Sequence, residues 1–134
     1  MSDDPISQVT ATARALVEAF SSHNAQAYFD FFAHDATFVF YTHPEILTSR
    51  KAWETLWAQW ENEVGFHVHS CESQDLHVQM VSADVAVMRH RVVSAIEMDG
   101  VVDTVTERET IVFCRYGSTW KAVHEHLSPV VALP

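Results

Sequence analysis

The part of the chain after Gly65 contains four long segments of strand-forming sequence separated by short turns. β-Branched and aromatic residues recur in these segments, and none of them contains Gly or Pro. The connecting sequences, Ser82-Ala83-Asp84, Asp99-Gly100 and Tyr116-Gly117-Ser118, have turn chemistry. The predicted strands cover residues 66–78, 85–97, 101–114 and 120–128. Three successive hairpins make an antiparallel meander, and strands of this length favour a sheet that bends around helices.

The first part of the chain predicts three helices and one strand. Asp4-Pro5 suits a helix start, and apolar residues repeat with helical spacing as far as Phe20. Asn24 can cap a second, shorter helix through Phe32, and a β-favouring run at 36–41 follows. A third helix begins after Thr48 or Ser49, with a stripe of Trp53, Leu56, Trp57 and Trp60. Such a stripe is typical of core packing and is compatible with a pocket wall.

Composition narrows the possible partners. A length of 134 residues predicts a single domain over residues 1–134. The formal net charge of -10 argues against nucleic acid and anionic membranes as partners. Cys71 and Cys114 are predicted to be buried thiols, because their spacing matches no metal knuckle or redox pair. The acidic start and the absence of an apolar run of about 18 residues predict a cytoplasmic location.

The end of the chain resembles a known family. Glu109-Thr110-Ile111-Val112-Phe113, a turn and a Trp-x-x-x-His-x-His-x-Ser ending at Ser128 are similar to the closing hairpin of the SnoaL-like branch of the nuclear-transport-factor-2-like superfamily. They are similar also to the association (hub) domain of calcium/calmodulin-dependent protein kinase II. The element order extends the likeness over nearly the whole chain. The resemblance implies the α+β class, as a cone-shaped α+β barrel with a pocket at its open end.

Two pairs of histidines raise the question of a metal site. His67 and His69 share one strand, and His124 and His126 share another, so that each pair points to one face. Two strands separate the pairs, and all four rings could meet only if the sheet closed tightly on itself. We therefore expect no metal site and no cofactor. The face that His124 and His126 occupy depends on the turn before the last strand, and the sequence leaves that face open.

Charged residues are expected on the concave face of the sheet. In the hub family the pocket-facing strand positions include arginines, and those positions fall here on Arg89, Ile111 and Leu127, so that only the first is retained. If the last turn is of the hub kind, the concave face carries Arg89, Arg91, Glu109, Ile111, Phe113, Val123, Glu125 and Leu127. Because an unpaired buried charge is costly, we expect Glu109 or Glu125 to pair with Arg89 or Arg91.

The opposite face suggests self-association. With the same turn it would carry Trp120 and Ala122 beside His124 and His126, which is too apolar for a bare surface. We therefore expect a homodimer.

The steroid isomerases with this fold imply catalytic positions that this sequence does not fill. Their general base falls at about Phe40 and their tyrosine donor at Leu16 or Val17. Of their catalytic positions, only that of the protonated carboxylic acid has a corresponding residue here, because Glu109 lies near it. The catalytic residues are therefore unknown from sequence.

The sequence thus predicts a SnoaL-like small-molecule-binding domain whose ligand is unknown. The predicted pocket residues are Tyr28, Phe40, Trp53, Trp57, Arg89, Arg91, Glu109, Ile111 and Glu125, with His124 and His126 in addition if the turn parity is reversed. One alternative is a cofactor-independent isomerase, cyclase, dehydratase or hydrolase that uses a pocket Glu or His. A second alternative is an oligomerisation module like the kinase hub.

Overall fold

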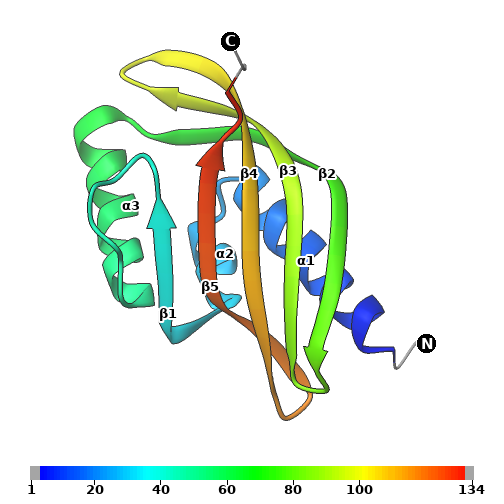
Figure 1. Ribbon diagram of the computed structural model, residues 1–134. Coiled ribbons are helices and arrows are strands. Elements are labelled where there is room, and N and C mark those ends of the chain that lie inside the picture. The colour runs from blue at the N-terminus through cyan, green and yellow to red at the C-terminus, as the bar shows by residue number, and fades with distance from the viewer. Residues whose placement is uncertain (1–3, 132–134) are drawn as a thin grey trace.

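The structure, a computed structural model, describes residues 4–131. It consists of three helices and a five-stranded sheet, which confirms the predicted α+β class (Figure 1). The helices are α1 (Pro5–Ser21), α2 (Ala25–Asp30) and α3 (Arg50–Val64). The strands are β1 (Phe32–Phe40), β2 (His67–Ser82), β3 (Val85–Met98), β4 (Val101–Tyr116) and β5 (Thr119–Pro129).

Local sequence signals set the helix ends. The side chains of Asp4, Asn24 and Ser49 each accept a hydrogen bond from a backbone N–H in the first turn of the helix that follows. Gly65 ends α3 in the left-handed conformation, with φ of 63°. No helix in residues 4–131 is long and apolar enough to span a bilayer.

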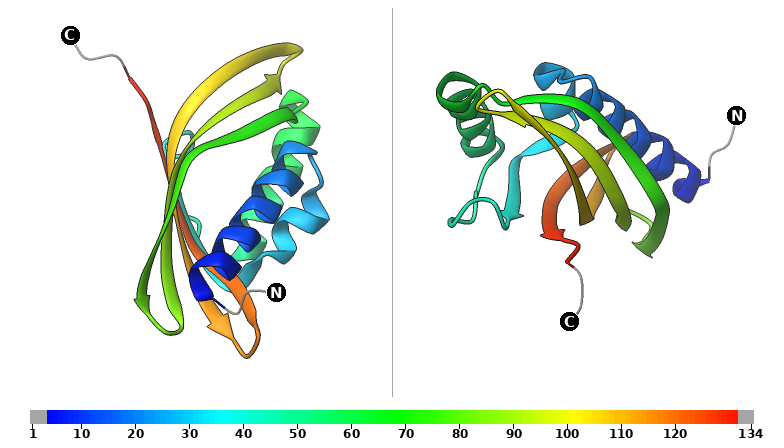
Figure 2. Two further views of the ribbon diagram at one scale, coloured as in Figure 1. Left: turned by 90° about the vertical axis from the view of Figure 1, so that its right-hand side faces the viewer. Right: turned by 90° about the horizontal axis from the view of Figure 1, so that it is seen from above.

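The sheet has the strand order β1-β5-β4-β3-β2. Strands β2 to β5 form the predicted antiparallel meander, and β1 adds to β5 in parallel. Within the described residues β1 and β2 do not pair with each other, so the curved sheet is open rather than closed into a barrel (Figure 2). Figure 2 shows that all three helices lie on its concave side.

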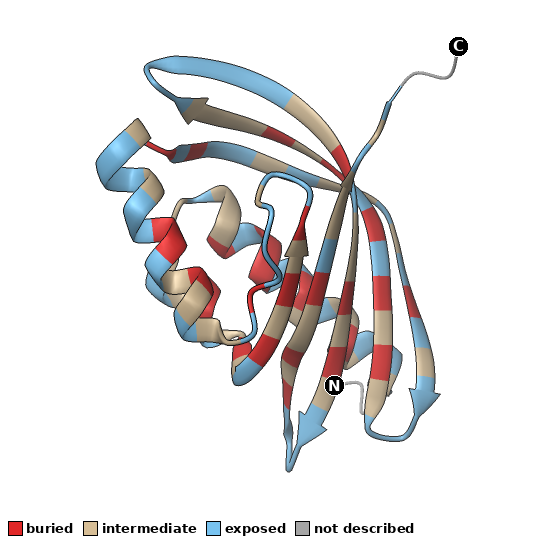
Figure 3. Ribbon diagram, turned by 60° about the vertical axis from the view of Figure 1, so that its left-hand side comes forward, coloured by how far each residue is buried: buried red, intermediate tan, exposed pale blue. Residues whose placement is uncertain are grey.

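The second helix and the first strand differ from their predicted limits. α2 ends at Asp30 rather than Phe32, and β1 begins at Phe32 rather than Ala36. Tertiary pairing explains the shift, because Phe32 pairs with Ala122 and the N–H of Ala122 donates to the carbonyl of Phe31. The alternation of buried and exposed residues along the strands is visible in Figure 3.

Aromatic side chains fill the space between helices and sheet. Trp57 is 2% exposed, and it stacks on Tyr28 with ring centroids 5.5 Å apart. Phe32 and Phe38 of β1 are fully buried in the same core. The indole stripe of α3 is therefore mainly core, and it leaves a hollow only where the sheet curves away from the helices.

Candidate functional site

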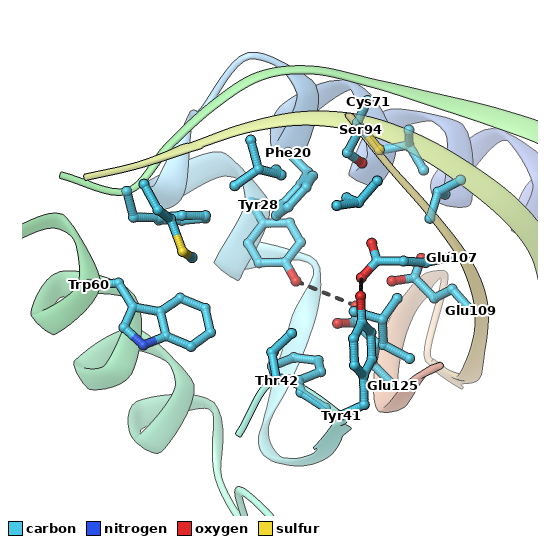
Figure 4. A pocket seen from close by; sticks show the side chains of 18 of the residues that line it. Phe20, Tyr28, Tyr41, Thr42, Trp60, Cys71, Ser94, Glu107, Glu109 and Glu125 are labelled. Carbon is cyan, nitrogen blue, oxygen red and sulfur yellow. Dashed lines mark hydrogen bonds between the residues drawn. The ribbon is translucent and has the colours of Figure 1, made fainter. Parts of the chain in front are cut away.

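A cavity of about 240 Å³ lies between the helices and the concave face of the sheet. Figure 4 shows Trp60 of α3 on one side of this cavity and three glutamates on the other. Apolar and aromatic side chains from all layers form most of the wall, among them Leu16, Val17, Phe20, Phe40, Trp53, Trp60, Phe66, Val92, Ile96 and Leu127. This is an apolar chamber with one polar side.

Glu125 of β5 is the most deeply buried carboxyl group in the cavity wall. Its residue is 3% exposed. The Tyr28 hydroxyl donates to Glu125 Oε1 at 3.4 Å, and Trp53 Nε1 donates to the Tyr28 oxygen at 3.1 Å. The two helices thus hold a phenol against this carboxyl group (Figure 4).

Glu109 of β4 has a histidine as its partner. His90 Nε2 lies 2.7 Å from Glu109 Oε1, and His90 Nδ1 lies 2.7 Å from Ser73 Oγ. The His90 side chain is completely buried, while that of Glu109 is 13% exposed. An imidazole with a proton on Nε2 satisfies both contacts, because the Ser73 hydroxyl then donates to Nδ1.

Glu107, two residues before Glu109 on β4, is the third glutamate of the cavity. The Tyr41 hydroxyl donates to Glu107 Oε2 at 2.6 Å. Tyr41 follows directly after β1 and is 47% exposed, so its side chain lies at the rim of the cavity rather than on its floor. Asp103 extends the row of acidic residues on β4.

Burial and mutual repulsion favour the protonated form of two of these groups. Burial raises the pKa of Glu125 well above its usual range, and the nearby charge of Glu109 adds to the effect. Burial also raises the pKa of Glu107, partly opposed by the hydrogen bond from Tyr41. Burial raises the pKa of the half-buried Cys71 thiol to about 12, so this thiol is not a nucleophile at neutral pH.

The structure brings five of the predicted pocket residues together. Tyr28, Phe40, Trp53, Glu109 and Glu125 all line the cavity. Two others, Trp57 and Ile111, are buried in the core and do not line it.

The predicted placement of Arg89 and Arg91 is wrong. Both are exposed on the convex face, and between them His90 points inward. The cause is the two-residue turn at Asp99 and Gly100, which pairs His90 with Glu109 and Arg89 with Thr110. The expected ion pair between a pocket glutamate and an arginine is therefore absent from the described residues, and an imidazole takes its place.

A β-bulge at Val123 sets the faces of β5. Val112 pairs with His124, but the next residue of β4, Phe113, pairs with Ala122. Trp120 and Ala122 therefore belong to the core, and not to the convex face as predicted.

His124 and His126 lie on the convex face. His124 Nδ1 is 2.7 Å from Thr37 Oγ1, and His126 is exposed. Burial and the proximity of His126 lower the pKa of His124. Within residues 4–131 no group of three or more His, Cys, Asp or Glu side chains is arranged to hold a metal ion.

Sequence reasoning missed several residues of the site. Glu107 could have been found, because strand alternation puts it on the same face as Glu109. His90 could have been found by counting outward from the Asp99-Gly100 turn. Trp60 belongs to the stripe that was compatible with a pocket wall, but Tyr41 gave no such signal, since its position depends on how the loop after β1 packs on the sheet.

The fold and the sequence together define the class of protein. The curved sheet with helices on its concave side is also found in an NTF2-like protein of unknown function in nutrient uptake from Rhodospirillum rubrum. The TM-score is 0.77 at 24% identity, and the match covers 92% of this chain and 98% of the other.

Two further structures are similar. A ketosteroid isomerase-like protein from Erwinia carotovora atroseptica has a TM-score of 0.81 at 18% identity, covering 98% of this chain and 100% of the other. The CamKII hub homology domain from Chlamydamonas reinhardtii has a TM-score of 0.73 at 19% identity, covering 96% and 99%. At these identities the likeness establishes the fold alone.

The chain belongs to the family of SnoaL-like domains, because residues 9–132 match the model of that family. This confirms the resemblance found in the sequence. Comparison with curated proteins gave no match.

Proposed function

We propose that the domain binds a small, largely apolar molecule in the cavity between its helices and the concave face of the sheet. The observation that supports this proposal most strongly is the shape and chemistry of the cavity: aromatic walls on one side and four carboxyl groups on the other. Ligand sites are typically concave, mostly apolar and equipped with a few polar groups that orient the ligand. At about 240 Å³ the cavity suits a compact ligand with a single ring or a short chain.

Filling the cavity tests this proposal. Ser94 is 3% exposed and lines the cavity, whereas the neighbouring Val93 points to the convex face. In a fragment screen by ligand-observed NMR, we expect the wild-type protein to bind compact aromatic fragments. The Ser94→Phe variant should lose those hits because the new ring occupies the cavity.

The matched control is Val93→Phe, which adds a ring to the same strand on the other face and should keep the hits. Circular dichroism establishes that both variants are folded. If folded Ser94→Phe retained the fragments bound by the wild type, the site of binding would lie elsewhere.

Acid–base catalysis is a second candidate function for the same cavity. It is favoured by the different environments of two neighbouring carboxyl groups: Glu125 is deeply buried against a phenol, and Glu109 contacts an imidazole. Two carboxyl groups in such different surroundings are suited to divide the roles of acid and base. The Erwinia relative is described as ketosteroid isomerase-like, and an isomerase, cyclase, dehydratase or hydrolase reaction would use such a pair.

Proton exchange tests this second function without a known substrate. We expect the wild-type protein to accelerate deuterium incorporation into 1-phenylpropan-2-one in D₂O, measured by NMR. Glu109→Gln should reduce the acceleration by about 100-fold or more, because a general base contributes on that order. The exposed Glu45→Gln variant is the control, and equal rates for the two variants would exclude Glu109 as the base.

The predicted homodimer is also part of this proposal. The convex face is less apolar than the sequence predicted, because Trp120 and Ala122 lie in the core. The half-buried Val112 and Cys114 remain on the convex face of β4. Sedimentation velocity at micromolar concentration is expected to give a dimer. A monomer would contradict the proposal, and a larger ring would favour the hub-like alternative.

A further inference from the structure

The cavity wall has an unbalanced set of charges. Four acidic side chains line it, Asp103, Glu107, Glu109 and Glu125, and no lysine or arginine within residues 4–131 does so. Arg89, Arg91 and Arg108 are exposed on the convex face, and Arg115 at the end of β4 pairs with Asp84. Among these four acidic side chains, Glu109 is the one in contact with a basic side chain, the imidazole of His90.

The apolar side of the cavity also suits a positive charge. Phe20, Tyr28, Trp60 and Phe66 line it, and Tyr28 contacts Glu125. The faces of aromatic rings attract cations, and they do so more strongly where water is excluded. A cation inside the cavity would therefore have carboxylates on one side and π-systems on the other (Figure 4).

We propose that the ligand of this cavity is a small organic amine, with its ammonium group against Glu107, Glu109 and Glu125 and its apolar part against Trp60 and Phe66. This inference rests on the proposed function, and it adds the chemical class of the ligand. An ammonium group gains from these carboxyl groups as they ionise beside it, whereas an anion would oppose their ionisation and a neutral ligand would gain no charge–charge attraction.

The proposal predicts that ligand binding changes the protonation of the carboxyl groups in the cavity. Without a ligand, burial holds the pKa of Glu125 and of Glu107 above the usual range. An ammonium group favours the ionised carboxylates, so its binding should release protons to the solvent. The other titratable groups that face these carboxyls are Tyr28 on α2, Tyr41 after β1, Cys71 on β2, His90 on β3 and Asp103 on β4, while α1 and α3 contribute apolar and indole side chains.

Three probes of matched shape test the proposal: 2-phenylethylamine, 2-phenylethanol and phenylacetate. Isothermal titration near neutral pH is expected to rank the amine at least about tenfold above the alcohol, with no binding of the carboxylate. The apparent enthalpy of amine binding should change with the ionisation enthalpy of the buffer, since protons are released. Alcohol binding should show no such change.

Variants locate the effect. Glu107→Gln should weaken the amine by about tenfold or more and leave the alcohol within about twofold, because it removes a charge at almost constant shape. The exposed Glu45→Gln should change neither. If the alcohol bound as tightly as the amine, or if Glu107→Gln left the amine unaffected, the amine class would be wrong while the proposed function stood. If none of the three compounds bound at millimolar concentration, the amine class and the proposed binding function would both be wrong for ligands of this size.

Discussion

Replacing Trp57 by alanine is expected to lower the free energy of unfolding by about 3–5 kcal/mol. Trp57 is 2% exposed and contacts aromatic rings on three sides, with Phe66 at 5.0 Å and Tyr28 and Phe29 each at 5.5 Å between ring centroids. The short alanine side chain leaves a void that the surrounding rings cannot fill without leaving their rotamers. Urea denaturation followed by far-ultraviolet circular dichroism measures the change.

Trp57→Phe is the matched variant, and it should cost far less. The Trp57 Nε1–H group is buried and has no hydrogen-bond partner in the described part of the chain. Phenylalanine removes this unsatisfied donor and keeps most of the ring, so that part of the packing loss is offset. A cost for Trp57→Phe close to that for Trp57→Ala would contradict this interpretation and would indicate an unseen partner for the indole N–H.

The second large effect is expected at Glu125. In Glu125→Gln a neutral amide replaces a carboxyl group whose pKa burial raises. Above the unfolded-state pKa, ionisation of Glu125 favours the unfolded protein, because the folded protein must keep this group protonated or bury a charge. The variant should therefore be more stable than wild type by about 1–3 kcal/mol near pH 8. The carbonyl oxygen of the new amide can still accept a hydrogen bond from the Tyr28 hydroxyl.

The pH dependence gives the sign of the effect. A carboxyl group with a raised folded-state pKa binds more protons in the folded state than in the unfolded state. Its contribution to stability is therefore complete below the unfolded pKa of about 4.3 and is lost as the pH rises through the folded value. Wild type and Glu125→Gln should have similar stability near pH 4 and diverge as the pH rises. The stability of Glu45→Gln should equal that of the wild type at every pH. If the stability of Glu125→Gln did so too, Glu125 would be ionised in the folded protein at no cost.

The fold could be predicted because its signals are local. The caps at Asp4, Asn24 and Ser49 and the turn at Asp99 and Gly100 each depend on a few adjacent residues. Asp99 and Gly100 both have positive φ, the conformation of the tight hairpin turn that the Asp-Gly sequence favours. Four long strands joined by such turns leave few arrangements other than a meander.

The site was harder to predict because one residue of register reverses a whole strand. The resemblance to the hub family puts Arg89 on the concave face, and strand alternation adds Arg91, but the pairing of Met98 with Val101 moves both to the convex face. The same pairing puts His90 beside Glu109, where the resemblance gave no residue. A turn inside the chain was thus a better guide to the pocket than a distant relative.

The bulge on β5 had no signal in the sequence. Nothing in Ala122-Val123-His124 distinguishes an extra residue from an ordinary strand, and the distortion exists only in the pairing with β4. Glu125 was nevertheless placed on the correct face, because the assumed shift at the preceding turn and the actual shift at Val123 have the same effect on its orientation.

The extra residue at Val123 also decides the chemical character of the chamber. Regular alternation continued from Trp120 and Ala122 would turn the imidazoles of His124 and His126 inward and Glu125 outward. The β5 side of the interior would then offer two imidazoles in place of the Glu125 carboxyl group, while Glu107 and Glu109 of β4 still faced the cavity. Pairing Val123 as an ordinary strand residue would therefore set imidazoles beside the carboxyl groups of β4 in the same chamber, while the core residues before it kept their places.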